Sequence, residues 1–111
     1  MADVTQIFAA NGPLPLKTSV QIQSNMPAVV TVAGSVWANA PQQMIGIALL
    51  IDGQVVGTAT IFANPGSTHM SVVPIEFPYT FQIGPHDFAL NPLNNATTSD
   101  KNDFYCVTVQ Y

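Results

Sequence analysis

The sequence predicts an all-β fold, an antiparallel β-sandwich of the jelly-roll type with about eight strands. Short runs rich in Val, Ile, Thr and aromatic residues recur along the chain, and Pro, Gly and Asn separate them at short intervals. From Lys17 onward no helical spacing of apolar residues accompanies these runs. Because parallel α/β folds need helices between their strands, that class is excluded.

The 111 residues are predicted to form a single domain with an N-terminal arm over residues 1–16. Within the arm, the spacing of Val4, Ile7 and Phe8 fits either a short helical turn or an edge strand. Beyond it, strands are expected over residues 18–23, 28–37, 44–51, 54–62, 68–77, 79–83, 86–91 and 103–111.

The strongest local signal is a hairpin that joins residues 45–51 to residues 54–62. Its turn is Asp52-Gly53, a pair that accepts the positive φ angles of a two-residue type I′ turn. Pro74 and Pro78 cannot donate to a sheet ladder, so we expect them at an edge, a bulge or a bend.

Charge is scarce in this chain. Charged residues make up 7% of the sequence and the net charge is −4, against about 25% charged residues in an ordinary domain. Lys17 and Lys101 are the only basic side chains. Phosphate backbones and anionic membrane surfaces both require basic clusters, so nucleic acid and charged membranes are excluded as partners.

Membrane insertion is not expected either, because no apolar run reaches the length of about 18 residues that a spanning helix needs. Cys106 is the only cysteine, which excludes an internal disulfide and a thiolate metal cage. No signal peptide is visible at the amino terminus. The compartment stays open, with a surface-exposed or extracellular location favoured over a cytoplasmic one.

Two predicted strands, 44–51 and 103–111, are apolar on both faces, whereas a solvated sandwich strand alternates apolar and polar residues. The second faces carry Met44, Ala48, Leu50, Phe104 and Cys106. These side chains are expected either to meet another copy of the chain or to be covered by residues 2–16.

Three segments resemble successive strands of the C1q and tumour-necrosis-factor-like jelly rolls: Ala33-Gly-Ser-Val-Trp37, residues 45–57 and residues 99–111. The resemblance covers roughly residues 18–111. It implies a compact jelly roll that forms a trimer, in a class that includes receptor ligands, fibre tips and some sugar-binding bacterial lectins. This chain is shorter than that pattern, lacks a collagen-like stem and ends in Val-Thr-Val-Gln-Tyr.

Two groups of residues are candidate ligand contacts. Trp37 could stack on a sugar ring with Asn39 as a hydrogen-bonding neighbour, although a buried or interface tryptophan is the alternative. Asp100, Asn102 and Asp103 concentrate oxygen atoms of the kind that calcium prefers, but they lack the EF-hand pattern. Capping of a turn by Asn and Asp explains them equally well. Apart from calcium, no cofactor is expected.

Catalysis has weak support. The two histidines, His69 and His86, lie on different predicted strands, and neighbours along a strand point to opposite faces, which disfavours a relay within His86-Asp87. The chain is therefore predicted not to be an enzyme, a hydrolase or isomerase being the weakest of three interpretations. The leading one is an interaction protein that self-associates, as a trimer, through apolar sheet faces. The alternative is a lectin-like module with a sugar site in polar loops or between protomers.

Overall fold

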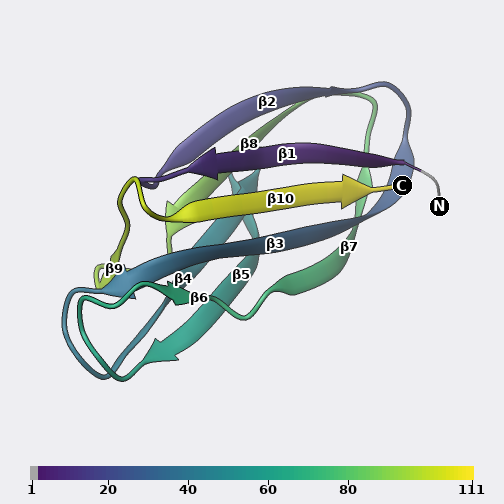
Figure 1. Cartoon of the computed structure of the whole chain (residues 1–111). Helices are drawn as coiled ribbons and strands as arrows, with labels where there is room; N and C mark the ends of the chain where they lie inside the picture. The colour runs from purple at the N-terminus through teal and green to yellow at the C-terminus, as the bar shows by residue number, and fades with distance from the viewer. Residues whose placement is uncertain (1–2) are drawn as a thin grey trace.

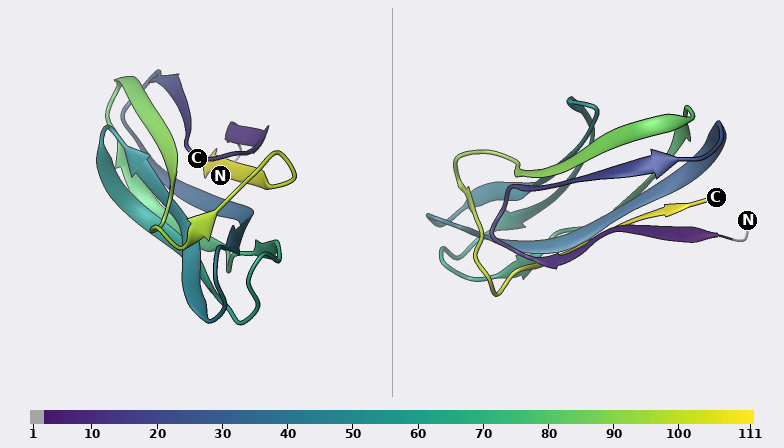
Figure 2. Two further views of the ribbon diagram at one scale, coloured as in Figure 1. Left: turned by 90° about the vertical axis from the view of Figure 1, so that its left-hand side faces the viewer. Right: turned by 90° about the horizontal axis from the view of Figure 1, so that it is seen from above.

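The computed structural model describes residues 3–111, which contain ten β-strands and no helix. The strands form two antiparallel sheets packed face to face (Figures 1 and 2). The predicted antiparallel sandwich is confirmed, with ten strands instead of eight. The strands are β1 (Val4–Asn11), β2 (Leu16–Ile22), β3 (Met26–Ala38), β4 (Gln43–Ile51), β5 (Gln54–Ala63), β6 (Met70–Ser71), β7 (Ile75–Phe81), β8 (Gly84–Pro92), β9 (Thr97–Thr98) and β10 (Phe104–Gln110).

The first sheet is built around β3, the longest strand. One edge of β3 pairs with β10, which in turn pairs with β1. On the same edge, beyond β10, the end of β3 pairs with β9. The other edge pairs in succession with β7 and β6. The second sheet has the order β2-β8-β4-β5. Consecutive strands such as β1 and β2 therefore lie in different sheets, and most strand pairing is non-local.

The core fills the space between the sheets, as alternation along the strands requires. In β4, the side chains of Ile45, Ile47, Leu49 and Ile51 are all buried. They face Tyr105 and the buried valines of the opposite sheet: Val30, Val32, Val36, Val107 and Val109.

The Asp52-Gly53 hairpin has the predicted register, with Ile51 paired to Gln54. Both turn residues have positive φ angles, 52° at Asp52 and 83° at Gly53, as a type I′ turn requires. Pro78 lies within β7, which pairs only with β3, and Pro74 lies in the gap between β6 and β7. The expected positions of both prolines are confirmed.

Three details differ from the predicted strands. Residues 4–11 form an edge strand, so the helical alternative for the arm was wrong. Pairing with β10 supplies hydrogen bonds that a short helical turn would lack. The strands expected over 68–77 and 79–83 are divided at another place: the break falls before β7, at Pro74, which has no N–H for the ladder, and β7 continues through Pro78. The short β9 was missed because two residues carry no periodicity.

The second faces of β4 and β10 are covered unevenly. Met44 is 48% exposed and Phe104 is 49% exposed, whereas Leu50 and Cys106 are half-buried and Ala48 is buried. Residues 4–11 do not lie over these faces, because β1 extends the sheet beside β10. The alternative that the N-terminal segment covers them is therefore wrong for residues 4–11, while Ala2 lies outside the described residues, and self-association stays a prediction.

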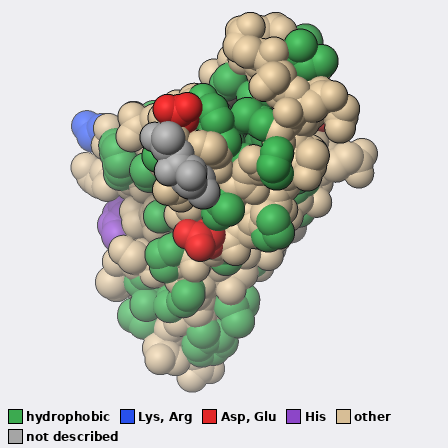
Figure 3. Space-filling model, turned by 90° about the vertical axis from the view of Figure 1, so that its right-hand side faces the viewer, with side chains coloured by type: hydrophobic (Ala, Val, Ile, Leu, Met, Phe, Trp, Pro, Cys, Tyr) green, Lys and Arg blue, Asp and Glu red, His purple; other side chains and the backbone are tan. Residues whose placement is uncertain are grey.

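Much of the surface consists of apolar and uncharged polar side chains. At the end of the sandwich where β1 begins and β10 ends, hydrophobic side chains are interspersed with polar ones and few charges (Figure 3). Among the described residues, no helix is long and apolar enough to cross a membrane.

Candidate functional sites

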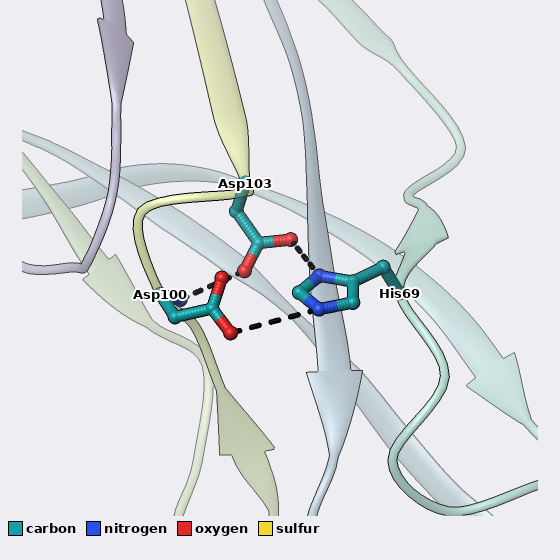
Figure 4. Close-up of side chains that lie close together, drawn as sticks. All are labelled: His69, Asp100 and Asp103. Atoms are coloured by element: carbon teal, nitrogen blue, oxygen red, sulfur yellow. Dashed lines mark hydrogen bonds and ion pairs between the residues drawn. The ribbon is translucent and has the colours of Figure 1, made fainter.

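Two sites on the described chain combine polar side chains in a way that favours a ligand. The first is the His69 cluster, formed by His69, Asp100 and Asp103 (Figure 4). His69 precedes β6, and the two aspartates lie in the turn that leads into β10. The ring of His69 lies between the two carboxylates, with Nδ1 at 2.7 Å from Asp103 Oδ1 and Nε2 at 3.6 Å from Asp100 Oδ2.

Asp103 is the fixed point of this cluster, since its side chain is fully buried. Its Oδ1 accepts hydrogen bonds from the Ser35 hydroxyl and the His69 ring, both at 2.7 Å. Its Oδ2 accepts from the backbone N–H of Asp100 at 2.9 Å. A buried carboxylate needs this many donors to offset the cost of leaving water. The hydrogen bond to Asp103 raises the pKa of His69 above its ordinary value.

Two further residues, Trp37 and Tyr105, each have a buried polar atom without a hydrogen-bond partner in residues 3–111. The ring of Trp37 lies 6.0 Å from that of His69, and its indole N–H has no hydrogen-bond partner among the described residues. The Tyr105 hydroxyl has none either, and burial raises the pKa of Tyr105 to about 12.

The structure therefore brings together three of the five residues that the sequence singles out as ligand contacts: Trp37, Asp100 and Asp103. Asn102 is exposed, and its backbone N–H donates to Asp100 Oδ1, which is the capping role that the sequence offers as an alternative. Asn39 donates its side-chain amide to the carbonyl of Asn95. His69 joins the cluster although it is not among the five residues that the sequence singles out.

The second site is a groove of about 580 Å³ on the outer face of the β2-β8-β4-β5 sheet, here called the sheet groove. It is lined by Lys17, Thr18, Ser19, Leu50, Gly53, Asp87, Phe88, Ala89 and Asn91. Its volume lies within the range of about 300–1,000 Å³ that small-molecule sites occupy.

Strand register explains how the groove is built. Ala89 of β8 pairs with Lys17 of β2 on one side and with Leu50 of β4 on the other. Its small side chain leaves a shallow floor between two larger ones. Asp87 and Asn91, two residues away along β8, point to the same outer face. Each end of the floor thus carries an oxygen-bearing side chain.

Asp87 is held in place at one end of the sheet groove. Its Oδ1 accepts a hydrogen bond of 2.6 Å from the Ser19 hydroxyl across the β2-β8 ladder. Its backbone N–H donates to Asp52 Oδ1 at 2.9 Å, and its carbonyl accepts from the Asp52 N–H at 2.8 Å. The β4-β5 turn is thereby fixed against β8 and closes this end of the groove.

The largely buried side chain of His86 also contacts the β4-β5 turn, through Asp52. Its Nδ1 lies 2.6 Å from Asp52 Oδ2, and its Nε2 lies 2.7 Å from the carbonyl oxygen of Gln82. Only the protonated ring donates at both positions. The Gln82 carbonyl, and after it Asp52, raise the pKa of His86, while the Asp87 N–H, and after it His86, lower the pKa of Asp52.

We expect the stability of the protein to fall on both sides of an acid-to-neutral plateau. A raised histidine pKa gives stability that is complete below the ordinary value of 6.5 and is lost as the pH rises through the raised value. A lowered aspartate pKa gives stability that is complete above 3.8 and is lost as the pH falls through the lowered value. Thermal unfolding between pH 3 and pH 9 measures both limbs.

The variants His86→Gln and His69→Gln separate the contributions on the alkaline side, because the pKa of His69 is also raised. Each variant is expected to lose stability less steeply than the wild type as the pH rises above 6.5. If the double variant declines over this range as steeply as the wild type, the histidines do not carry the effect.

No family model and no curated protein matches the sequence. Solved structures match at the level of the fold. A family 35 carbohydrate-binding module from Clostridium thermocellum has a TM-score of 0.54 at 9% identity, covering 96% of this chain and 91% of that one. The corresponding module of Cellvibrio japonicus Abf62 has a TM-score of 0.55 at 14% identity, covering 92% and 67%.

A β-glucosidase from Paenibacillus barengoltzii matches with a TM-score of 0.56 at 13% identity. The match covers 97% of this chain, which spans only 10% of the enzyme. At these identities the similarities establish the fold alone. They support a β-sandwich of the jelly-roll type, without the specific C1q and tumour-necrosis-factor assignment.

Proposed function

We propose that this chain is a carbohydrate-binding module that holds a short, neutral glycan in the sheet groove. The observation that carries the proposal is the arrangement of Lys17, Asp87 and Asn91 around the small apolar floor formed by Ala89 and Leu50. The fold similarity to two carbohydrate-binding modules supports it.

The groove matches the two chemical faces of a sugar. One face of a pyranose ring is built of C–H groups, which the apolar floor can cover, and the rim consists of hydroxyls that both donate and accept. Asp87 offers carboxylate oxygens, Lys17 offers donors and Asn91 offers both. Because the groove pairs one cation with one anion, it favours an uncharged ligand over a phosphorylated or sulfated one.

Hydrogen bonds, rather than aromatic stacking, would hold the sugar. Phe88 is the one aromatic residue of the lining, and its side chain lies in the core. At about −0.3 kcal/mol per non-hydrogen atom, a monosaccharide is expected to bind with a Kd on the order of 1 mM, and a longer glycan more tightly.

A glycan array, followed by titration calorimetry on the best ligand with and without calcium, tests the proposal. Asp87→Ala and Asn91→Ala each remove hydrogen bonds to the sugar and are expected to weaken binding at least about tenfold. Ala89→Leu fills the floor and should abolish binding. Glu76→Ala, an exposed change on β7 of the other sheet, is the matched control and should leave the Kd unchanged.

The absence of any bound glycan would contradict the proposed function. Binding that survives all three groove changes would contradict the groove as its location. If such binding were lost on substitution of Trp37 or Asn39, the sugar site would lie at these two residues, which the sequence analysis names as sugar contacts.

A second proposal, self-association, rests on exposed apolar side chains of the same sheet. Met44 and Phe62 are cross-strand partners on β4 and β5, and each is 48% exposed. Light scattering is expected to report a multiple of 11.8 kDa at micromolar concentration, a trimer if the C1q-like resemblance holds. A monomer would refute this proposal and leave the glycan site untouched. Both proposed roles fit a secreted or surface location.

A further inference from the structure

The chain contains two histidine–aspartate pairs, and they differ in what the second ring nitrogen faces. In the His86 pair, both ring nitrogens have acceptors within 2.7 Å. In the His69 cluster, Nδ1 is bound to Asp103, whereas Nε2 faces Asp100 Oδ2 at 3.6 Å, beyond hydrogen-bond length. The side chains of His69 and Asp100 are 40% and 41% exposed, so this gap is open to solvent.

We propose that His69 Nε2 and Asp100 Oδ2 bind a divalent transition metal of the Zn²⁺ type, with Asp103 as the positioning residue. The inference goes beyond the proposed glycan function and uses none of the residues that line the sheet groove.

The separation of the two ligand atoms matches a shared metal ion. Zinc binds imidazole nitrogen and carboxylate oxygen at about 2.0–2.2 Å in tetrahedral geometry, which places two ligand atoms about 3.4 Å apart. The observed 3.6 Å needs only a small adjustment. A direct hydrogen bond would need a larger one.

The orientation of His69 also suits a ligand role. With its Nδ1–H donated to Asp103, the neutral ring presents the Nε2 lone pair to Asp100. Histidines that bind metals usually donate their other N–H to a carboxylate or carbonyl, which fixes the tautomer and raises the basicity of the ligand. Asp103 can hold the ring firmly because it is itself held by Ser35 and by the Asp100 N–H.

The donor set selects the class of metal. Calcium and magnesium take oxygen ligands, typically six or more for calcium, whereas an imidazole nitrogen suits zinc, cobalt, nickel or copper. Two protein ligands leave the other coordination positions to water or to a donor group of a ligand. The affinity is therefore expected to be micromolar, not that of a closed structural zinc site.

Titration calorimetry of untagged, chelator-treated protein with Zn²⁺ at pH 7.5 tests the inference. One ion per chain is expected, and Co²⁺ should give the visible absorption bands of tetrahedral coordination. His69→Gln and Asp100→Asn should each remove this binding. Asp103→Asn, if folded, should weaken it about 10- to 100-fold. Circular dichroism checks that each variant is folded.

Two variants serve as matched controls. His86→Gln removes the other histidine, and Cys106→Ser removes the only thiol; both should bind Zn²⁺ as the wild type does. The inference is overturned if the wild type binds no Zn²⁺ up to 1 mM, or if His69→Gln binds Zn²⁺ as tightly as the wild type. It is also overturned if Ca²⁺ binds as strongly as Zn²⁺, with the same affinity for the wild type and for His69→Gln. Groove substitutions should change none of these results, so the metal site and the glycan site fail independently.

Discussion

Replacing Asp103 with alanine is expected to lower the free energy of unfolding by about 3–5 kcal/mol, because three donors lose a buried acceptor at once. These donors are the Ser35 hydroxyl, the His69 ring and the Asp100 N–H. The backbone contacts of Asp103, an N–H donated to the Asp100 carbonyl and a carbonyl that accepts from Gly12, do not depend on the side chain. Chemical denaturation of the variant therefore measures the carboxylate alone.

Asp100→Ala is the matched control for this prediction. Its carboxylate is 41% exposed and accepts one hydrogen bond, from the backbone N–H of Asn102. Water can replace that acceptor, so a loss of less than about 1 kcal/mol is expected. If Asp103→Ala and Asp100→Ala lowered the free energy of unfolding equally, the burial of the Asp103 carboxylate would add nothing to the stability it contributes. Asp103→Asn should fall between them, because an amide keeps one acceptor oxygen and places a donor against other donors.

Most of the fold could be predicted from the sequence because strand patterns are local. The hairpin at Asp52-Gly53 and the two-sided apolar character of β4 are each visible within about ten residues of chain. What could not be predicted is the order of strands within the sheets. β2 pairs with β8, about 70 residues away, and β1 pairs with the last strand. No local pattern encodes such pairing.

The two sites show the same difference between local patterns, which the sequence reveals, and non-local pairing, which it does not. The polar turn before β10 was visible in the sequence as a concentration of oxygen ligands. Its histidine was not, because His69 reaches the turn only through the pairing of β6 with β3. The sheet groove was missed because its residues come from three strands and the β4-β5 turn. A signal did exist: Asp87, Ala89 and Asn91 alternate with buried residues on β8, which marks an outer face that is polar around a small residue.

Replacing Gly46 with alanine is expected to destabilise the fold by about 3 kcal/mol or more, because the new methyl group would meet backbone. Gly46 lies in the middle of β4, and a Cβ at this position would overlap the carbonyl oxygen of Ala59 on the neighbouring β5. The Cα of Thr60 would lie at 3.0 Å. A side chain could rotate away, but a strand held on a hydrogen-bonded ladder cannot move without breaking that ladder.

The backbone of Gly46 is also fixed from the other side. Its N–H donates to the Thr97 hydroxyl at 3.2 Å, and its carbonyl accepts from the Leu93 N–H at 2.9 Å. These bonds attach Leu93, which follows β8, and Thr97 of β9 to β4. A shift of β4 that relieved the clash would stretch them, so the expected damage spreads beyond one strand pair.

Gly57→Ala is the control that separates a backbone clash from a side-chain clash. A Cβ at Gly57 would lie 2.8 Å from the Phe77 ring and 2.9 Å from Ile75 Cδ1. Both belong to half-buried side chains on the edge strand β7, which can adjust at a cost of about 1 kcal/mol. Denaturant midpoints of the two variants should therefore differ clearly. If Gly57→Ala proved as destabilising as Gly46→Ala, the side chains of β7 would be unable to move aside. The contrast between a backbone clash and a side-chain clash would then be wrong.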